Sequence, residues 1–110
     1  MYGDLITQME AWKEAQVDQV TADKLVCGKP CFLLSACLVA SSVGAATVVL
    51  RDGHSTSGDA LITLGAPTSG NDHRNFSFPI YFKKGLYADV GSNVTELDLH
   101  YIIRQYVKKD

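Results

Sequence analysis

The sequence predicts an all-β fold, an antiparallel β-sandwich or jelly-roll-like domain with a short N-terminal helix and an extended C-terminal strand. Short apolar segments, roughly six or seven, are separated by turns rich in Gly, Ser and Asn, which is typical of such domains. From residue 25 onward the apolar residues recur with the two-residue period of a strand. The 110 residues suffice for one domain with its own core. We expect an N-terminal helix and connector arm over 1–24 and the sandwich domain with its C-terminal extension over 25–110.

Residues 4–16 are expected to form the helix, because apolar side chains recur there at helical spacing and Asp4 can cap the first turn. A helix this short is marginal on its own, so its apolar face must pack on its own domain or on a partner. Residues 17–24 are polar and are expected to connect the helix to the sheets. The apolar face of the helix consists of Leu5, Ile6, Met9 and Trp12.

The central strands are read from their composition and from the turns between them. The segment 66–75 is polar and is expected to be a long loop. Pro79 lacks a backbone donor, so its strand should lie at a sheet edge or contain a bulge. The expected strands cover 29–41, 45–52, 59–65, 76–82 and 86–90.

The segment 94–109 shows the clearest alternation in the chain. Leu97, Leu99, Tyr101 and Ile103 share one parity, and polar residues occupy the other. This pattern predicts an antiparallel strand with one buried and one solvated face. Because the pattern runs past a usual strand length, we expect the tail to project from the domain and pair with another chain.

The composition argues against several classes of partner. The formal net charge is -2, so no basic surface for nucleic acid or an anionic membrane is indicated. The longest apolar run, 31–43, is interrupted by serines and is too short to span a bilayer. The residues after Met1 do not resemble a secretory signal. We expect neither nucleic acid nor a membrane as a partner.

Three cysteines occur, Cys27, Cys31 and Cys37, at a spacing that fits no common zinc motif. Free cysteine behaves as a small apolar residue, so reduced and buried thiols are expected. A disulfide between subunits is the alternative. It would use Cys27 or Cys31, because these two residues flank a Gly-Lys-Pro turn.

One short loop contains Asp52, His54 and Ser55, the residue types of a catalytic triad. A triad needs side chains that converge from separate parts of a scaffold, which neighbours on a tight turn cannot do. Asp-Gly after a strand is itself a turn signal. Asp72 and His73 form a second Asp-His pair, but no ligand spacing supports a metal site. The sequence predicts a hairpin tip, no catalytic residue, no metal or other cofactor, and no enzyme.

Four segments of the chain form an ordered series: Lys29-Pro30-Cys31, Val48 to Gly53, Phe78 to Tyr87 and Gly91 to Tyr101. Taken in order, they resemble small β-sandwich virion proteins encoded by tailed bacteriophages. The resemblance covers roughly residues 28–102 and implies a non-enzymatic structural part of a virion, made in the host cytoplasm and often oligomeric.

We therefore expect a capsid decoration (cement) protein, or a head–tail or tail accessory protein. It would form a symmetric homo-oligomer, such as a trimer, and lock neighbouring subunits of the major capsid protein or other virion proteins. Its contacts are expected where apolar residues exceed what a surface tail needs. These residues are Leu5, Ile6, Met9, Trp12, Ile102, Tyr106 and Val107.

Two alternatives belong to other functional classes. A carbohydrate- or receptor-binding module on a phage tail or fibre would use loops 51–59 and 70–75 with the nearby aromatic residues. A small enzyme on a cupin-like scaffold would need metal-binding histidines on its strands. His54, His73 and His100 are instead expected on two loops and a solvated face.

Overall fold

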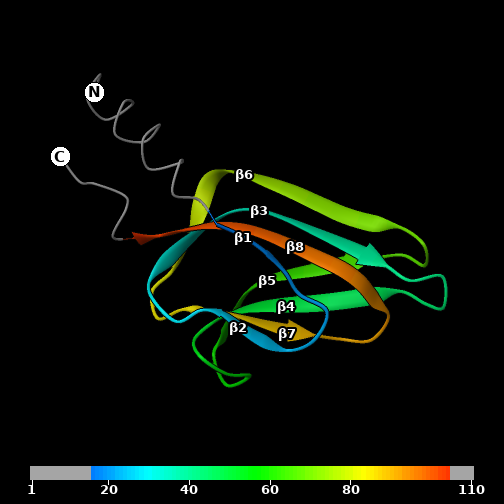
Figure 1. Ribbon diagram of the computed structural model, residues 1–110, viewed down its shortest axis with the longest axis horizontal. Helices are drawn as coiled ribbons and strands as arrows, with labels where there is room; N and C mark the ends of the chain where they lie inside the picture. The colour runs from blue at the N-terminus through cyan, green and yellow to red at the C-terminus, as the bar shows by residue number, and fades with distance from the viewer. Residues whose placement is uncertain (1–15, 105–110) are drawn as a thin grey trace.

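Residues 16–104 are described by a computed structural model, in which eight strands form two antiparallel sheets of four strands each (Figure 1). The all-β sandwich predicted from the sequence is thus confirmed for this part of the chain. Sheet A has the order β1 (Gln16–Gln19), β8 (Val94–Ile103), β3 (Cys31–Ala40) and β6 (Asn71–Phe82). Sheet B has the order β2 (Lys24–Cys27), β7 (Leu86–Val90), β4 (Ala46–Asp52) and β5 (Asp59–Ala66).

The strand pairing follows one simple rule. The first strand pairs with the last, the second with the seventh, the third with the sixth and the fourth with the fifth. Two further pairings, of β3 with β8 and of β4 with β7, join these ribbons into the two sheets. The chain therefore forms one long antiparallel hairpin that is wound over itself into two layers, and the edge strands are β1, β6, β2 and β5.

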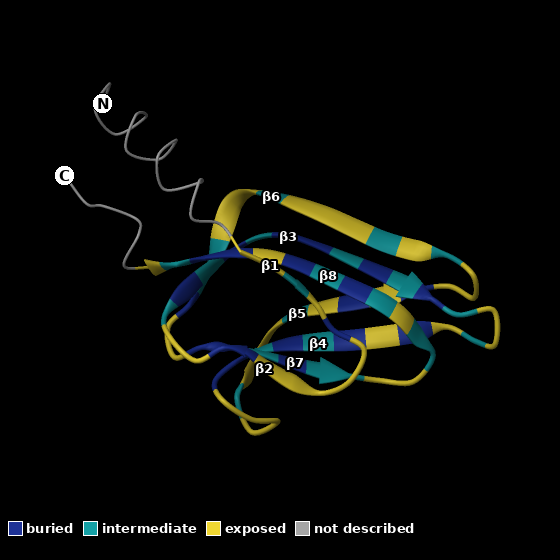
Figure 2. Cartoon of the chain, viewed as in Figure 1, coloured by how far each residue is buried: buried dark blue, intermediate teal, exposed yellow. Residues whose placement is uncertain are grey.

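The core lies between the inner faces of the two sheets. In β8 the residues Leu97, Leu99 and Tyr101 are buried, as their shared parity predicted. A fully buried Leu or Val side chain contributes roughly 1.5–3 kcal/mol relative to an exposed one. The large fully buried side chains include Phe82, Leu33, Leu38, Leu97 and Leu99 from sheet A and Val48, Leu50, Leu64 and Leu86 from sheet B, and buried residues line both sheets in Figure 2.

A change of parity occurs in the middle of β3. The register of β3 against both neighbours shifts between Leu33 and Ser35. Cys31 and Leu33 face the core before the shift, and Ala36 and Leu38 face it afterwards. The core-facing positions therefore change parity along the strand, and the outward residues Phe32, Leu34, Cys37 and Val39 are half-buried.

Two segments that were expected to be irregular are strands. Gln16–Gln19, placed in the polar connector from the sequence, forms β1 and pairs with β8. Asn71–Asn75, placed in a long loop, belongs to β6, so the loop covers only 67–70. Both are largely exposed edge segments, and an edge that buries little shows no apolar alternation. The helix expected over 4–16 lies outside the described residues except for Gln16, as does the tail beyond Arg104.

Asn93 fixes the turn that leads into β8. Its φ is 65°, in the left-handed region, and its Nδ2 donates to the carbonyl oxygen of Ala45 at 3.1 Å. Its own carbonyl accepts the backbone N–H of Ser41 at 2.8 Å. Asn tolerates this conformation better than most residues.

We expect Asn93→Ala to lower the free energy of unfolding by about 1–2 kcal/mol, because Ala is strained at positive φ and the amide contact is lost. Asn93→Gly keeps the backbone conformation without strain and loses only the amide contact, so its loss should be smaller. Urea titrations of both variants measure the difference. Equal losses would assign the effect to the amide alone.

Candidate functional site

Three turns and the end of β8 meet at one end of the sandwich, on the left of Figure 1. The N–H of Arg104 donates to the carbonyl of Pro30 at 2.9 Å, and the N–H of Gly53 donates to the carbonyl of Gly85 at 3.1 Å. Four exposed cationic side chains lie on these segments. We call this the basic end, defined by Lys29, Lys83, Lys84 and Arg104.

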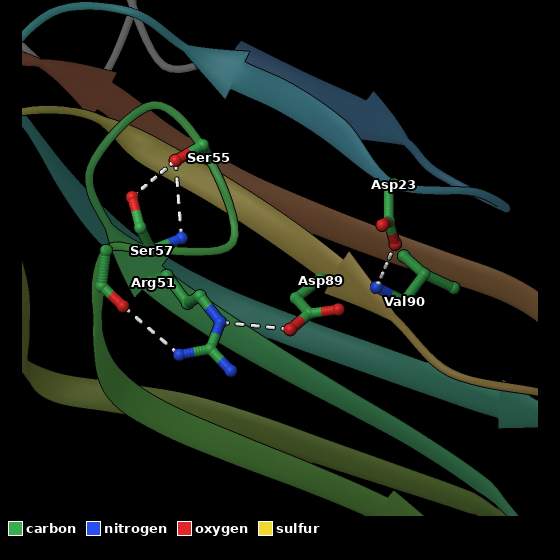
Figure 3. Close-up of polar contacts among 7 residues, drawn as sticks. Asp23, Arg51, Ser55, Ser57, Asp89 and Val90 are labelled. Carbon is green, nitrogen blue, oxygen red and sulfur yellow. Dashed lines mark hydrogen bonds and ion pairs between the residues drawn. The ribbon is translucent and has the colours of Figure 1, made fainter.

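The loop 53–58 is a hairpin tip fastened to the basic end. Asp52 is buried, and its Oδ1 accepts the backbone N–H of Lys84 at 2.8 Å. The Nε2 of His54 donates to the carbonyl of Lys84 at 2.8 Å. Ser55 Oγ bonds to Ser57 Oγ at 2.7 Å and accepts the Ser57 N–H at 3.2 Å (Figure 3). The three triad-like side chains thus each have a partner that holds the turn, as the hairpin interpretation predicted.

Arg51 braces the base of this loop from β4. Its Nε donates to Asp89 Oδ2 at 2.9 Å, and its Nη1 donates to the carbonyl of Gly58 at 3.1 Å (Figure 3). The two contacts join β4 to β7 and to the end of the hairpin tip. The loop is therefore held on both sides.

Cys27 and Cys31 are free and buried, and neither reaches the surface. The thiol of Cys27 donates to the carbonyl of Lys29 at 3.4 Å, and burial raises the pKa of the Cys31 thiol well above its usual range. The alternative of an intersubunit disulfide through Cys27 or Cys31 stays a prediction, and it would require these buried side chains to become exposed. The Gly-Lys-Pro turn is at the surface, but the side chains on both sides of it face inward.

The aromatic residues of β6 divide into three environments. Phe82 is buried and Phe76 packs against the core, as expected. Tyr81 stacks on Phe32 of β3 with ring centroids 4.9 Å apart. Arg104 lies 5.6 Å from the centre of the Tyr81 ring, and its Nη1 donates to the Tyr81 hydroxyl at 3.0 Å. Sequence reasoning missed this cluster, because β3, β6 and β8 come together only in the fold.

Phe78 is the most exposed large apolar side chain in the described chain, at 90%. The register of β6 against β3 is regular up to Ile80 opposite Leu33 and resumes at Asn75 opposite Ser35. The residues between, 76–79, therefore have no regular partner and form a bulge. The edge strand or bulge predicted from Pro79 is confirmed, and exposed residues cover this part of β6 in Figure 2.

The expected interface residues fall into two groups. Ile102 has 2% of its surface exposed and lies opposite Phe32 in the sheet, and its place at an interface stays a prediction. It continues β8 instead of starting a projecting tail. The other six, Leu5, Ile6, Met9, Trp12, Tyr106 and Val107, lie outside the described residues.

Both described ends of the chain lie at the basic end. Gln16 is opposite Tyr101 near the end of β8, and Arg104 contacts the 28–30 turn. The segments 1–15 and 105–110 therefore both connect to the domain at this end.

The two Asp-His pairs do not meet. Asp52 and His54 are at the basic end, whereas Asp72 and His73 lie opposite Leu38 and Cys37, toward the far end of β3. About 20 Å or more of strand separates them. Asp72 is paired with Arg74 at 3.0 Å, and this hydrogen bond lowers the pKa of Asp72. Loops 51–59 and 70–75 thus cannot form one binding site.

Within residues 16–104, no group of three or more His, Cys, Asp or Glu side chains is arranged to hold a metal ion. The same range contains no helix that is long and apolar enough to cross a membrane. Comparison with family models, curated proteins and solved structures finds no match to this chain.

Proposed function

We propose that this chain is a non-enzymatic structural protein of a tailed-phage virion. It acts as a capsid decoration (cement) protein or a head–tail or tail accessory protein that oligomerises and locks neighbouring subunits. One observation carries the proposal. The two segments that contain six of the seven expected interface residues, 1–15 and 105–110, connect to the domain at the same end, where four exposed cations lie.

The strand order supports an assembly role at the level of architecture. The pairing of first with last strand, second with seventh and so on is that of a jelly roll, which viral capsid proteins, lectins and cupins share. Architecture alone does not decide among these classes. The proposal therefore depends on where the chemistry-bearing residues lie.

The histidines favour the structural role over a cupin-like enzyme. His54 bonds to a backbone carbonyl at the basic end, and His73 is exposed on the edge strand β6. His100 is exposed on the outer face of sheet A, where its Nδ1 lies 2.8 Å from Ser35 Oγ. The space between the sheets is filled by apolar side chains. No histidine faces that space in the described part of the chain.

The exposed apolar side chains favour lateral contacts between subunits. Each of the four edge strands carries one of them: Val17 on β1, Leu25 on β2, Leu61 on β5 and Phe78 on β6. They are too dispersed to form one patch, and a stable interface buries about 1,200–2,000 Å². The segments outside the described residues are therefore needed to complete an interface.

The test uses particles made by the genome that encodes this chain. After density-gradient purification, quantitative mass spectrometry should find the chain at many copies per particle. Removing residues 2–15 keeps β1 intact and should prevent incorporation while leaving the melting temperature of the purified domain nearly unchanged. Absence of the full chain from particles would refute the virion role. Normal incorporation of the truncated chain would refute the role of the N-terminal segment.

A further inference from the structure

We propose that residues 1–15 of one copy dock on Phe78 and the basic end of a second copy. This contact rests on the proposed function, in which copies of the chain self-associate. The N-terminal segment of each copy is then an arm that binds the domain of another copy, and we call it the exchanged arm. Exchange from each copy to the next closes a ring when the rotation allows it.

The shape of the β6 bulge supplies the apolar contact. Phe78 lies on residues 76–79, which have no regular partner on β3, and Pro79 restricts the backbone beside it. Phe78 is 90% exposed and lies three residues before Tyr81, whose ring contacts Arg104. Aromatic residues and Arg are the residue types that anchor interfaces. The apolar stripe of the arm, Leu5, Ile6, Met9 and Trp12, matches such a surface in chemistry.

The charges of the two surfaces are complementary. Residues 1–15 contain Asp4, Glu10 and Glu14 against Lys13, a side-chain charge of -2 from three acids and one base. Three of the four cations of the basic end lie on turns that contain no carboxylate, the turns 28–30, 53–58 and 83–85. Two carboxylates flank the 53–58 turn: that of Asp52 is buried and bonded to the Lys84 N–H, and that of Asp59 is exposed at the start of β5.

The direction of the chain favours a second copy over the arm's own domain. β1 runs from the basic end into sheet A, so the residues before Gln16 precede it at that end. To reach Phe78 of the same copy, the arm would have to reverse and cross β8 and β3, a distance of about 14 Å. Residues 5–15 contain no Gly, Pro, Asn, Asp or Ser, the residues that form turns.

The experiment places the photoreactive amino acid p-benzoylphenylalanine at position 78 of the full chain. Equal amounts of light and 15N-labelled protein are unfolded in urea, refolded together and irradiated. Mass spectrometry should find crosslinks from position 78 to residues 1–15 that join light to heavy chains. The matched control carries the photoreactive group at Val43, which is 85% exposed in the loop at the opposite end, and should give no crosslink to residues 1–15.

A second variant measures the strength of the contact. Phe78→Ser should weaken self-association by roughly 10-fold or more, and Val43→Ser should leave it unchanged. Three outcomes would each overturn the arm exchange. They are crosslinks that join only chains of the same isotope, crosslinks from position 78 to a surface other than residues 1–15, and a chain that stays monomeric. The mass-spectrometric analysis of particles distinguishes a failure of the arm exchange from a failure of the proposed function. If the chain is present in virions but gives no crosslink from position 78 to residues 1–15, only the arm exchange is refuted.

Discussion

Leu99→Ala should lower the free energy of unfolding by about 2–5 kcal/mol. Leu99 has 0% of its surface exposed and lies on β8, an interior strand of sheet A, between Asp18 of β1 and Ala36 of β3. Small neighbours such as Ala36 cannot fill the space that the missing methyl groups leave. The loss therefore includes both the free energy of transferring those groups from water to the core and the cost of the cavity that remains. A urea titration with a common m-value for wild type and variant measures the loss.

Leu61→Ala is the matched control for this prediction. Leu61 is 40% exposed on the edge strand β5, on the parity opposite to the buried Leu64. The same atoms are removed there, but 40% of the residue's surface is already exposed to water and an edge strand leaves no closed cavity, so the loss should stay below about 1 kcal/mol. Equal losses at the two positions would show that the assignment of inner and outer faces is wrong.

The inner faces could be predicted because burial leaves a direct trace in the sequence. In β8 the parity of Leu97, Leu99 and Tyr101 alone identified the core side. The Asp52-Gly53 turn and the Asn93 turn were likewise predictable, since each uses a residue type that its backbone conformation requires. These features depend on residues that are close in sequence.

Edges and bulges left no such trace. The exposed start of β6 resembles a loop in its polarity, and its strand character comes from pairing with β3, which is distant in sequence. In β3 both faces carry apolar residues, so the sequence alone does not show which residues, Cys31 among them, face the core. The basic end was not predictable either, because its four cations belong to separate segments that the fold brings together.

Gly85→Ala tests whether the basic end is as tightly assembled as its contacts indicate. A Cβ at this position would lie 2.7 Å from the carbonyl oxygen of Cys27 and 2.9 Å from Cδ2 of His54. The first of these atoms is backbone and cannot rotate away. We expect the variant to lose about 1–3 kcal/mol of unfolding free energy, the usual cost of overpacking.

Gly65→Ala provides the control, because a Cβ there meets nothing within 4 Å. Ala reduces the freedom of the unfolded chain, so this variant should be neutral or more stable by up to about 1 kcal/mol.

Hydrogen exchange then locates the loss of structure in the Gly85→Ala variant. Protection should fall first at the N–H groups of Lys84 and Gly53, which bond to Asp52 and to Gly85. Retained protection at both groups, or equal stability of the two variants, would mean that the turns at this end move independently. If these turns moved independently, Phe78 and the cations would not keep one fixed arrangement for the exchanged arm to bind. The hydrogen-exchange measurement therefore also tests a condition on which the arm exchange depends.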